Sequence, residues 1–143
     1  MAYYWTSDLE IGNALIDSEH QHLVVAVNKL LTACSENKGY KVLDKLLSFL
    51  VKYAAKHFCD EEKLQLECNY PNYTNHKKQH EQFKSTVHDL IERTKREGAS
   101  TELVNKATLF VGDWLVSHIK EEDLKIGEHI HTLPLALQET LLK

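Results

Sequence analysis

Apolar residues recur along the chain at alternating steps of three and four, which is the spacing of one face of an amphipathic helix. Four such stripes run from position 16 to 34, 43 to 68, 76 to 94 and 104 to 118. Short segments rich in turn-forming residues separate them, at 35–40, 69–75 and 96–100. Connections this short join antiparallel neighbours, so the pattern predicts an all-α fold, an up-down-up-down antiparallel four-helix bundle.

The two ends of the chain do not follow this rhythm. The early segment AYYWTSDLEIGN shows no sustained period, and we expect it to form an N-terminal arm along the bundle. Residues 133–143, LPLALQETLLK, contain a helix-breaking proline at position 134. The 143 residues are enough for one domain, so we expect a single domain at 1–132 and a C-terminal tail at 133–143.

Every stripe carries polar residues at positions where apolar ones are expected. In chain order these are His20, His57, Glu61, His76, His80 and His118. They lie near the start of the first and third helices and near the end of the second and fourth. In an up-down bundle these four termini are at the same end, so the six side chains should meet in one layer about two helical turns thick.

A layer of five buried imidazoles is difficult to explain without a metal. The rings would lack hydrogen-bond partners, and protonating several of them would bury repelling charges. A metal removes both difficulties, because neutral imidazoles donate lone pairs and carboxylates offset the cationic charge. Five imidazoles with one or two carboxylates exceed the four ligands of tetrahedral zinc and suit two octahedral ions that share bridging ligands. Nitrogen-rich ligation with carboxylate bridges favours iron, with manganese second.

A second carboxylate is expected within the segment HIKEED, residues 118–123. Glu122 follows His118 by four residues and shares its face of a regular helix, whereas Asp123 lies about 140° away. The stripe alone favours Glu122.

Composition argues against several other classes of protein. The net charge is −4 and the lysines are scattered, so we expect no nucleic-acid partner. Eighteen consecutive apolar residues occur nowhere, and the first twenty residues contain no basic residue, so neither a membrane span nor an export signal is expected. The three cysteines are odd in number and widely spaced, which fits a reducing compartment and predicts a cytoplasmic location.

The combination H…HxxxE…HxxxH…HxxxxD on four helices resembles the hemerythrin family in its single-domain bacterial form. The matching segments span about residues 4–132: Trp5 before IGNALIDSEHQHL, then HFCDEE with a YP turn after it, HKKQH, and WLVSHIKEED. The resemblance implies a cofactor of two iron ions joined by an oxo or hydroxo bridge. It assigns His76, His80 and His118 to one iron, His20 and His57 to the other, and Glu61 and Asp123 as bridges between them.

The resemblance favours Asp123 over Glu122. For Asp123 to face the same side as His118, the fourth helix must contain a π-type turn there or end early. Two departures from the family pattern are Ile126, where bacterial relatives often have tyrosine, and Gln65, where methionine is common.

The function implied by the resemblance is reversible dioxygen binding for transport, storage or delivery. It implies no enzyme activity and no catalytic residue, a monomer, and delivery of dioxygen to an oxygen-consuming acceptor protein. The residues that match the family's apolar pocket lining are Leu23, Phe58, Trp114 and Leu115. Two alternatives stay open: an oxygen or redox sensor, and a di-iron enzyme that handles nitric oxide or peroxide.

Overall fold

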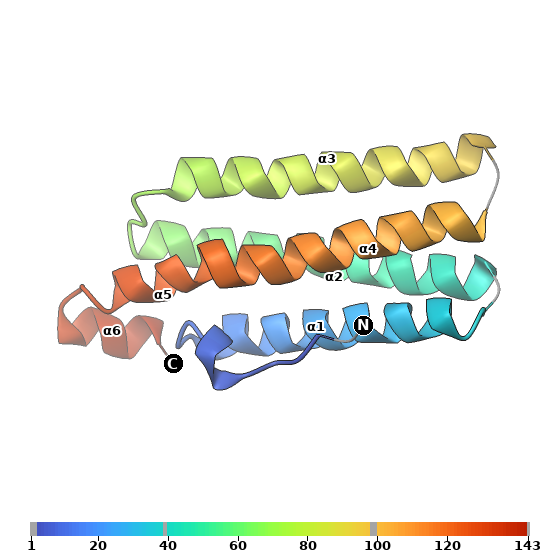
Figure 1. Ribbon diagram of the computed structural model, residues 1–143. Helices are drawn as coiled ribbons and strands as arrows, with labels where there is room; N and C mark the ends of the chain where they lie inside the picture. The colour runs from blue at the N-terminus through green and yellow to red at the C-terminus, as the bar shows by residue number, and fades with distance from the viewer. Residues whose placement is uncertain (1–2, 39, 98–99, 143) are drawn as a thin grey trace.

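Four long helices lie side by side in the computed structural model, which describes residues 3–38, 40–97 and 100–142 (Figure 1). They are α1 (Ala14–Ser35), α2 (Tyr40–Glu67), α3 (Tyr73–Glu97) and α4 (Thr101–His118), and successive helices run antiparallel. The described residues contain no strand, so the predicted all-α, up-down-up-down bundle is confirmed. Residues 39 and 98–99, in two of the predicted connections, lie outside the described ranges.

The start of α1 is held by side-chain hydrogen bonds. The Asn13 side chain accepts from the backbone N–H of Ile16 at 3.0 Å and caps the helix. Within the first turn, the Asp17 carboxylate accepts from the backbone N–H groups of Ile11 at 2.8 Å and Gly12 at 3.1 Å. These bonds fix where the arm meets the helix that carries His20.

The N-terminal arm lies along α1 as expected and contains the short 3₁₀ helix η1 (Ser7–Leu9) (Figure 1). Its first described residue, Tyr3, pairs with the Asn28 side chain of α1 through two hydrogen bonds of 2.8 Å, one in each direction. The arm therefore runs along about the first two thirds of α1.

The fourth helix is longer than its stripe. α4 continues through η2 (Ile119–Asp123), a π-helical turn, into α5 (Leu124–Ile130) as one rod (Figure 1). The π-type turn expected near residue 123 is thus confirmed, and it places Asp123 on the buried face of the rod.

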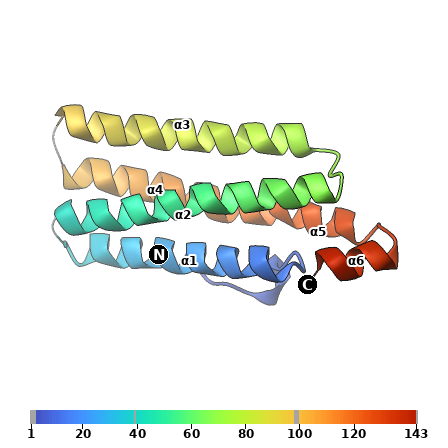
Figure 2. The same ribbon diagram turned by 180° about the vertical axis from the view of Figure 1, so that it is seen from behind.

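Residues of the expected tail form α6 (Leu135–Leu141), which lies next to the start of α1 at one end of the bundle (Figure 2). Leu141 is buried in a cluster with Ile11 and Ile16, and its carbonyl accepts from the Asn13 side chain at 2.6 Å. The division between a domain at 1–132 and a tail at 133–143 stays a prediction.

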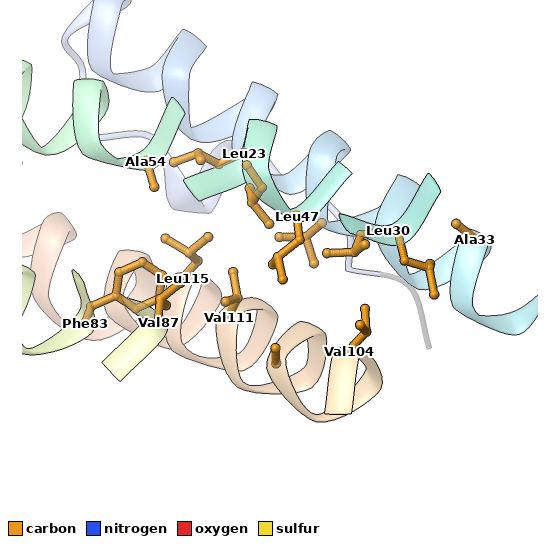
Figure 3. Packing of buried hydrophobic residues seen from close by; sticks show 14 of the residues in the cluster. Leu23, Leu30, Ala33, Leu47, Ala54, Phe83, Val87, Val104, Val111 and Leu115 are labelled. Atoms are coloured by element: carbon orange, nitrogen blue, oxygen red, sulfur yellow. The ribbon is translucent and has the colours of Figure 1, made fainter. Parts of the chain in front are cut away.

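The apolar core has two parts. The larger one fills the bundle between the four helices, and its side chains point toward one another in Figure 3. The smaller one closes the end near α6 and includes Ile16, Leu64 and Ile126. Along α1 the two parts are separated at His20, between Ile16 and Leu23, and along α2 at Glu61, between Phe58 and Leu64. A buried polar layer therefore lies between two apolar clusters.

Candidate metal centre

The polar layer consists of seven buried side chains that could hold metal ions. They form two groups, each with one donor atom per residue within 4.8 Å of the others: Glu61, His76, His80, His118 and Asp123 in one, and His20, His57, Glu61 and Asp123 in the other. The structure thus brings together all seven residues predicted as ligands, and Glu61 and Asp123 belong to both groups.

Glu61 divides its two carboxylate oxygens between the groups. Its Oε1 lies 2.8 Å from Nε2 of His76 and 3.3 Å from Nε2 of His80. Its Oε2 lies 3.2 Å from Nε2 of both His20 and His57. A carboxylate that presents one oxygen to each of two nitrogen clusters has the geometry of a bridging ligand.

Asp123 divides its oxygens in the same way. Its Oδ1 lies 3.0 Å from Nε2 of His76 and of His118, whereas its Oδ2 lies 3.0 Å from Nε2 of His20. Glu122 belongs to neither group and instead lies 3.8 Å from the exposed Lys125. The π-helical turn is what brings Asp123, rather than Glu122, to the centre of the bundle.

The three-histidine group fits a metal better than it fits hydrogen bonds among its members. Nε2 of His118 lies 3.1 Å from Nε2 of His80 and 3.0 Å from Nε2 of His76. Neutral rings whose Nε2 lone pairs converge in this way repel one another unless a cation lies between them. All three rings are at least nine-tenths buried, so water does not screen that repulsion.

Two further carboxylates, the buried Glu19 and the partly buried Glu62, orient rings of the centre from behind, and the sequence patterns did not identify either. Nδ1 of His57 donates to Glu19 at 2.9 Å, and Nδ1 of His80 donates to Glu62 at 2.8 Å. A ring that donates from Nδ1 keeps its Nε2 free as a metal ligand. Lys56 also reaches Glu19, at 2.9 Å.

The charges in the layer are strongly coupled. Burial opposes protonation of His57, but the carboxylates of Glu61 and Glu19 outweigh it and raise the pKa of His57 to about 10. Burial also opposes protonation of His76, but the carboxylates of Asp123 and Glu61 outweigh it and raise the pKa of His76 to about 9. Burial disfavours the charged form of Glu61, yet the histidines around it hold its pKa well below the usual range. Without metal the layer therefore holds protons that metal ions must displace.

Aromatic and aliphatic side chains cover the layer on the side of the large core. Phe58 stacks on His80 with ring centroids 4.0 Å apart, and Trp114 stacks on His118 at 4.4 Å. Leu23 and Leu115 are buried in the same cluster and point into the bundle in Figure 3. The four residues expected to line an apolar pocket thus lie on one side of the polar layer.

One further polar residue lies close to the centre in sequence. Gln65 is one helical turn beyond Glu61 and is 0% exposed, and neither atom of its side-chain amide has a hydrogen-bond partner among the described residues. The remaining histidines lie apart from the centre: His22, His88 and His131 are exposed, and His129 is half-buried with its Nε2 2.8 Å from the carbonyl of Cys68.

The fold and the donor set define a class: a four-helix bundle that holds a dinuclear non-haem metal centre. The family model described as hemerythrin HHE cation binding domain matches residues 12–130. The chain belongs to the hemerythrin family, and it is a di-iron oxygen-binding protein.

Proteins that are similar to this chain in sequence or structure carry names from the same family. A myohemerythrin from Riftia pachyptila is 31% identical over 123 residues, which cover 86% of this chain and 89% of the relative. A bacteriohemerythrin from Methylococcus capsulatus is 32% identical over 126 residues, covering 86% and 92%. A crystal structure of wild-type hemerythrin superposes with a TM-score of 0.79 at 26% identity, covering 90% of this chain and 97% of that one. None of the described helices is long and apolar enough to cross a membrane.

Proposed function

We propose that the protein is a reversible dioxygen carrier and that the seven buried residues are its iron ligands. In this assignment His76, His80 and His118 hold one iron, His20 and His57 hold the other, and Glu61 and Asp123 bridge them. The observation that carries the proposal is the division of both carboxylates between two unequal sets of imidazoles. With one further bridging oxygen, the first iron would have six ligands and the second would have five, which would leave one open position for dioxygen.

When bound, the iron pair supplies the open coordination position and the electrons with which dioxygen is held. The side chains of this protein have a different task. Phe58 and Trp114 stack on two of the rings, and Leu23 and Leu115 are buried next to them. This apolar wall keeps water from the centre, and exclusion of water and of proton sources favours release of dioxygen unchanged.

The carboxylates near the centre support a carrier over an enzyme. Glu61 and Asp123 contact imidazoles of both groups, and Glu19 and Glu62 accept hydrogen bonds from His57 and His80. None of these four is left as a general acid or base for substrate chemistry. We expect neither peroxide nor nitric oxide to be turned over at a catalytic rate, which an oxygen or nitric oxide electrode measures directly.

The carrier function is tested by cycling the protein between dioxygen and vacuum. The iron-loaded protein is reduced without air, exposed to dioxygen and then evacuated, while its visible spectrum and iron content are followed. We expect two iron ions per chain and a charge-transfer band that appears and disappears over repeated cycles. A band that forms once and decays to the oxidised protein, or a preparation that holds no iron, would contradict the proposal.

The ligand assignment is tested by two neighbouring substitutions in η2. Asp123→Asn should lose iron or hold it much more weakly, because an amide neither carries charge nor bridges well. Glu122→Gln should keep both iron ions, since Glu122 contacts Lys125 and no ring of the centre. The opposite result would assign the bridge to Glu122.

We further propose that the protein acts as a monomer in the cytoplasm and passes dioxygen to an oxygen-consuming acceptor protein. Cys34, Cys59 and Cys68 are all free thiols, which supports a reducing compartment. Light scattering of the iron-loaded protein over a hundredfold range of concentration tests the monomer, and a mass that doubles with concentration would contradict it.

A further inference from the structure

A cleft of about 450 Å³ opens between α3 and α4 beside the three-histidine group. Its wall includes the ring of His118, which is 7% exposed, whereas none of the other four histidines of the centre lines it. Nδ1 of His118 has no hydrogen-bond partner among the described residues; the same holds for Nδ1 of His20 and His76, but those two rings are fully buried and do not line the cleft. His118 is therefore the ring through which the centre meets this part of the surface.

Trp114 forms part of the same wall and connects it to the interior. Its indole lies nearly parallel to the His118 ring, at 11°, with ring centroids 4.4 Å apart. The Trp114 ring also lies close to two interior rings, with centroid distances of 4.3 Å to Phe83 and 5.9 Å to Phe58. A molecule seated in the cleft would thus touch two conjugated rings, one of them a proposed iron ligand.

The rest of the wall is acidic. It includes Asp113, Glu121 and Glu122, together with uncharged side chains, and no lysine or arginine. Lys125 lies 3.8 Å from Glu122, and the lysine pair at 77–78 lines a separate pocket on α3. At least two carboxylates at the cleft are therefore not offset by a cation in its wall, and their potential attracts positive charge.

We propose that this cleft is the docking and electron-entry site for a protein electron donor that presents positive charge around a reduced haem or flavin. The inference rests on the proposed assignment of His118 as an iron ligand. The proposed carrier needs such a site, because an iron pair left in the ferric state has no electrons with which to hold dioxygen until a donor reduces it again. Steering by opposite charge is what allows a small, short-lived redox interface to form quickly.

The electron count of the step is simple. Two electrons leave the donor, one at a time, and each converts one ferric ion to ferrous. The donor centre is oxidised by the same two electrons, and one proton from water converts the oxo bridge to hydroxo. No bond of the protein forms or breaks, so the residues of the cleft act only through position and charge.

The first experiment measures how the charge of the reductant affects the rate. The diferric protein is reduced in a stopped-flow instrument by the radical cation of methyl viologen, and separately by the radical anion of its bis-sulfonatopropyl analogue. We expect Asp113→Asn/Glu121→Gln to slow reduction by the cation about threefold or more at low ionic strength, and not to slow reduction by the anion. The matched control Glu81→Gln/Glu92→Gln changes the net charge equally on the outer face of α3 and should leave both rates close to wild type. Equal slowing by both double variants would overturn the proposal.

The second experiment measures docking without any electron transfer. The chain has two tryptophans, Trp114 in the cleft and Trp5 on the arm, so labelling with 5-fluorotryptophan yields two fluorine resonances. Oxidised cytochrome c, a basic haem protein used here only as a probe, is added to the diferric protein. We expect the Trp114 resonance to shift and the Trp5 resonance to stay. The shift should be lost in Asp113→Asn/Glu121→Gln and kept in the control; a shift of Trp5 alone, or of neither, would overturn the proposal.

Failure of this inference can be told apart from failure of the proposed function. Iron content and oxygen cycling are measured on the same samples before reduction is timed. If they are normal and the cleft substitutions do not change the reduction rate, the proposed electron-entry site is wrong, but the proposed carrier function is still supported. If wild-type protein holds no iron or does not cycle, the proposed function itself fails.

Discussion

Replacement of Glu19 by glutamine should weaken iron binding although Glu19 is no proposed ligand. Its side chain is only 3% exposed and accepts hydrogen bonds from Nδ1 of His57 and from Lys56, each at 2.9 Å. Burial disfavours its charge, but these hydrogen bonds outweigh the burial and lower the pKa of Glu19 to about 2. The carboxylate is therefore ionised at neutral pH, and it both orients the His57 ring and makes Nε2 a stronger donor.

The magnitude follows from comparing Glu19 with Glu62, which accepts from His80. Loss of a carboxylate behind a metal-bound histidine lowers metal affinity by about 10- to 100-fold, or about 1.4–2.7 kcal/mol. The side chain of Glu62 is 15% exposed, so water can replace part of what its substitution removes. We expect Glu19→Gln near the upper end of this range and Glu62→Gln near the lower end.

The assay is competition for ferrous iron against a chelator of known affinity, without air. Asp60→Asn is the matched control, because Asp60 lies 2.9 Å from the same Lys56 and contacts no ring of the centre. The reasoning is refuted if Glu19→Gln holds iron as tightly as wild type. It is equally refuted if Asp60→Asn loses as much affinity, since the effect would then come from Lys56 and not from the ring.

Three further predictions concern stability. Gly127→Ala should destabilise the protein by about 1–2 kcal/mol, because the added Cβ would lie 2.5 Å from the carbonyl oxygen of Ile11. The cost of this clash exceeds the gain in helix propensity from alanine. Urea unfolding measures the change, and an unchanged midpoint would contradict the close approach. Gln65→Met should stabilise the metal-free protein by about 1–3 kcal/mol, since it removes a buried amide without partners, and a loss of stability would show that the amide is satisfied. The metal-free protein should lose stability as pH rises from 7 to 10, because the pKa values of His57 and His76 are raised in the folded protein. The stabilisation from protonating these two rings is fully present below the unfolded pKa near 6.5 and is lost above about 9–10. Thermal unfolding at each pH checks this, and a flat profile would contradict it.

The bundle could be predicted from sequence because each helix carries its own period. Steps of three and four locate the buried face of a helix without knowledge of its neighbours. The antiparallel order then brings His20, His57 and His118 to one level from three different helices. Fold and layer follow from local pattern plus short connections, and both agree with the structure.

Asp123 could not be derived from the stripe, because regular spacing from His118 leads to Glu122. The reason lies in the backbone, since η2 adds one residue to the turn. A signal was nevertheless present further along: Ile126 and Ile130 are buried, whereas a regular continuation would bury Lys125 and position 129. The apolar residues after the π turn carry the same one-residue shift as Asp123.

The carboxylates that accept hydrogen bonds from the histidine Nδ1 atoms could not be predicted from the sequence pattern, for a different reason. Which carboxylate a ring nitrogen meets depends on the rotation of that ring and on how two helices pack. Glu19 precedes a proposed ligand and Glu62 follows one, so both are off the stripe by one position. Only the packed bundle shows that they face into it.

The π turn also makes this part of the chain depend on one local backbone conformation. If Ile119–Asp123 became a regular α-helix with its sequence unchanged, everything beyond it would turn by about 100°. Asp123 would move away from the other residues of the metal centre, and the same rotation would expose Ile126 and Ile130, which close the end of the bundle. Deleting one residue between 119 and 122 would instead bring Asp123 to the fourth position after His118 and keep these three side chains on the buried face. The extra residue thus links assembly of the metal centre to closure of the core through the shape of the backbone.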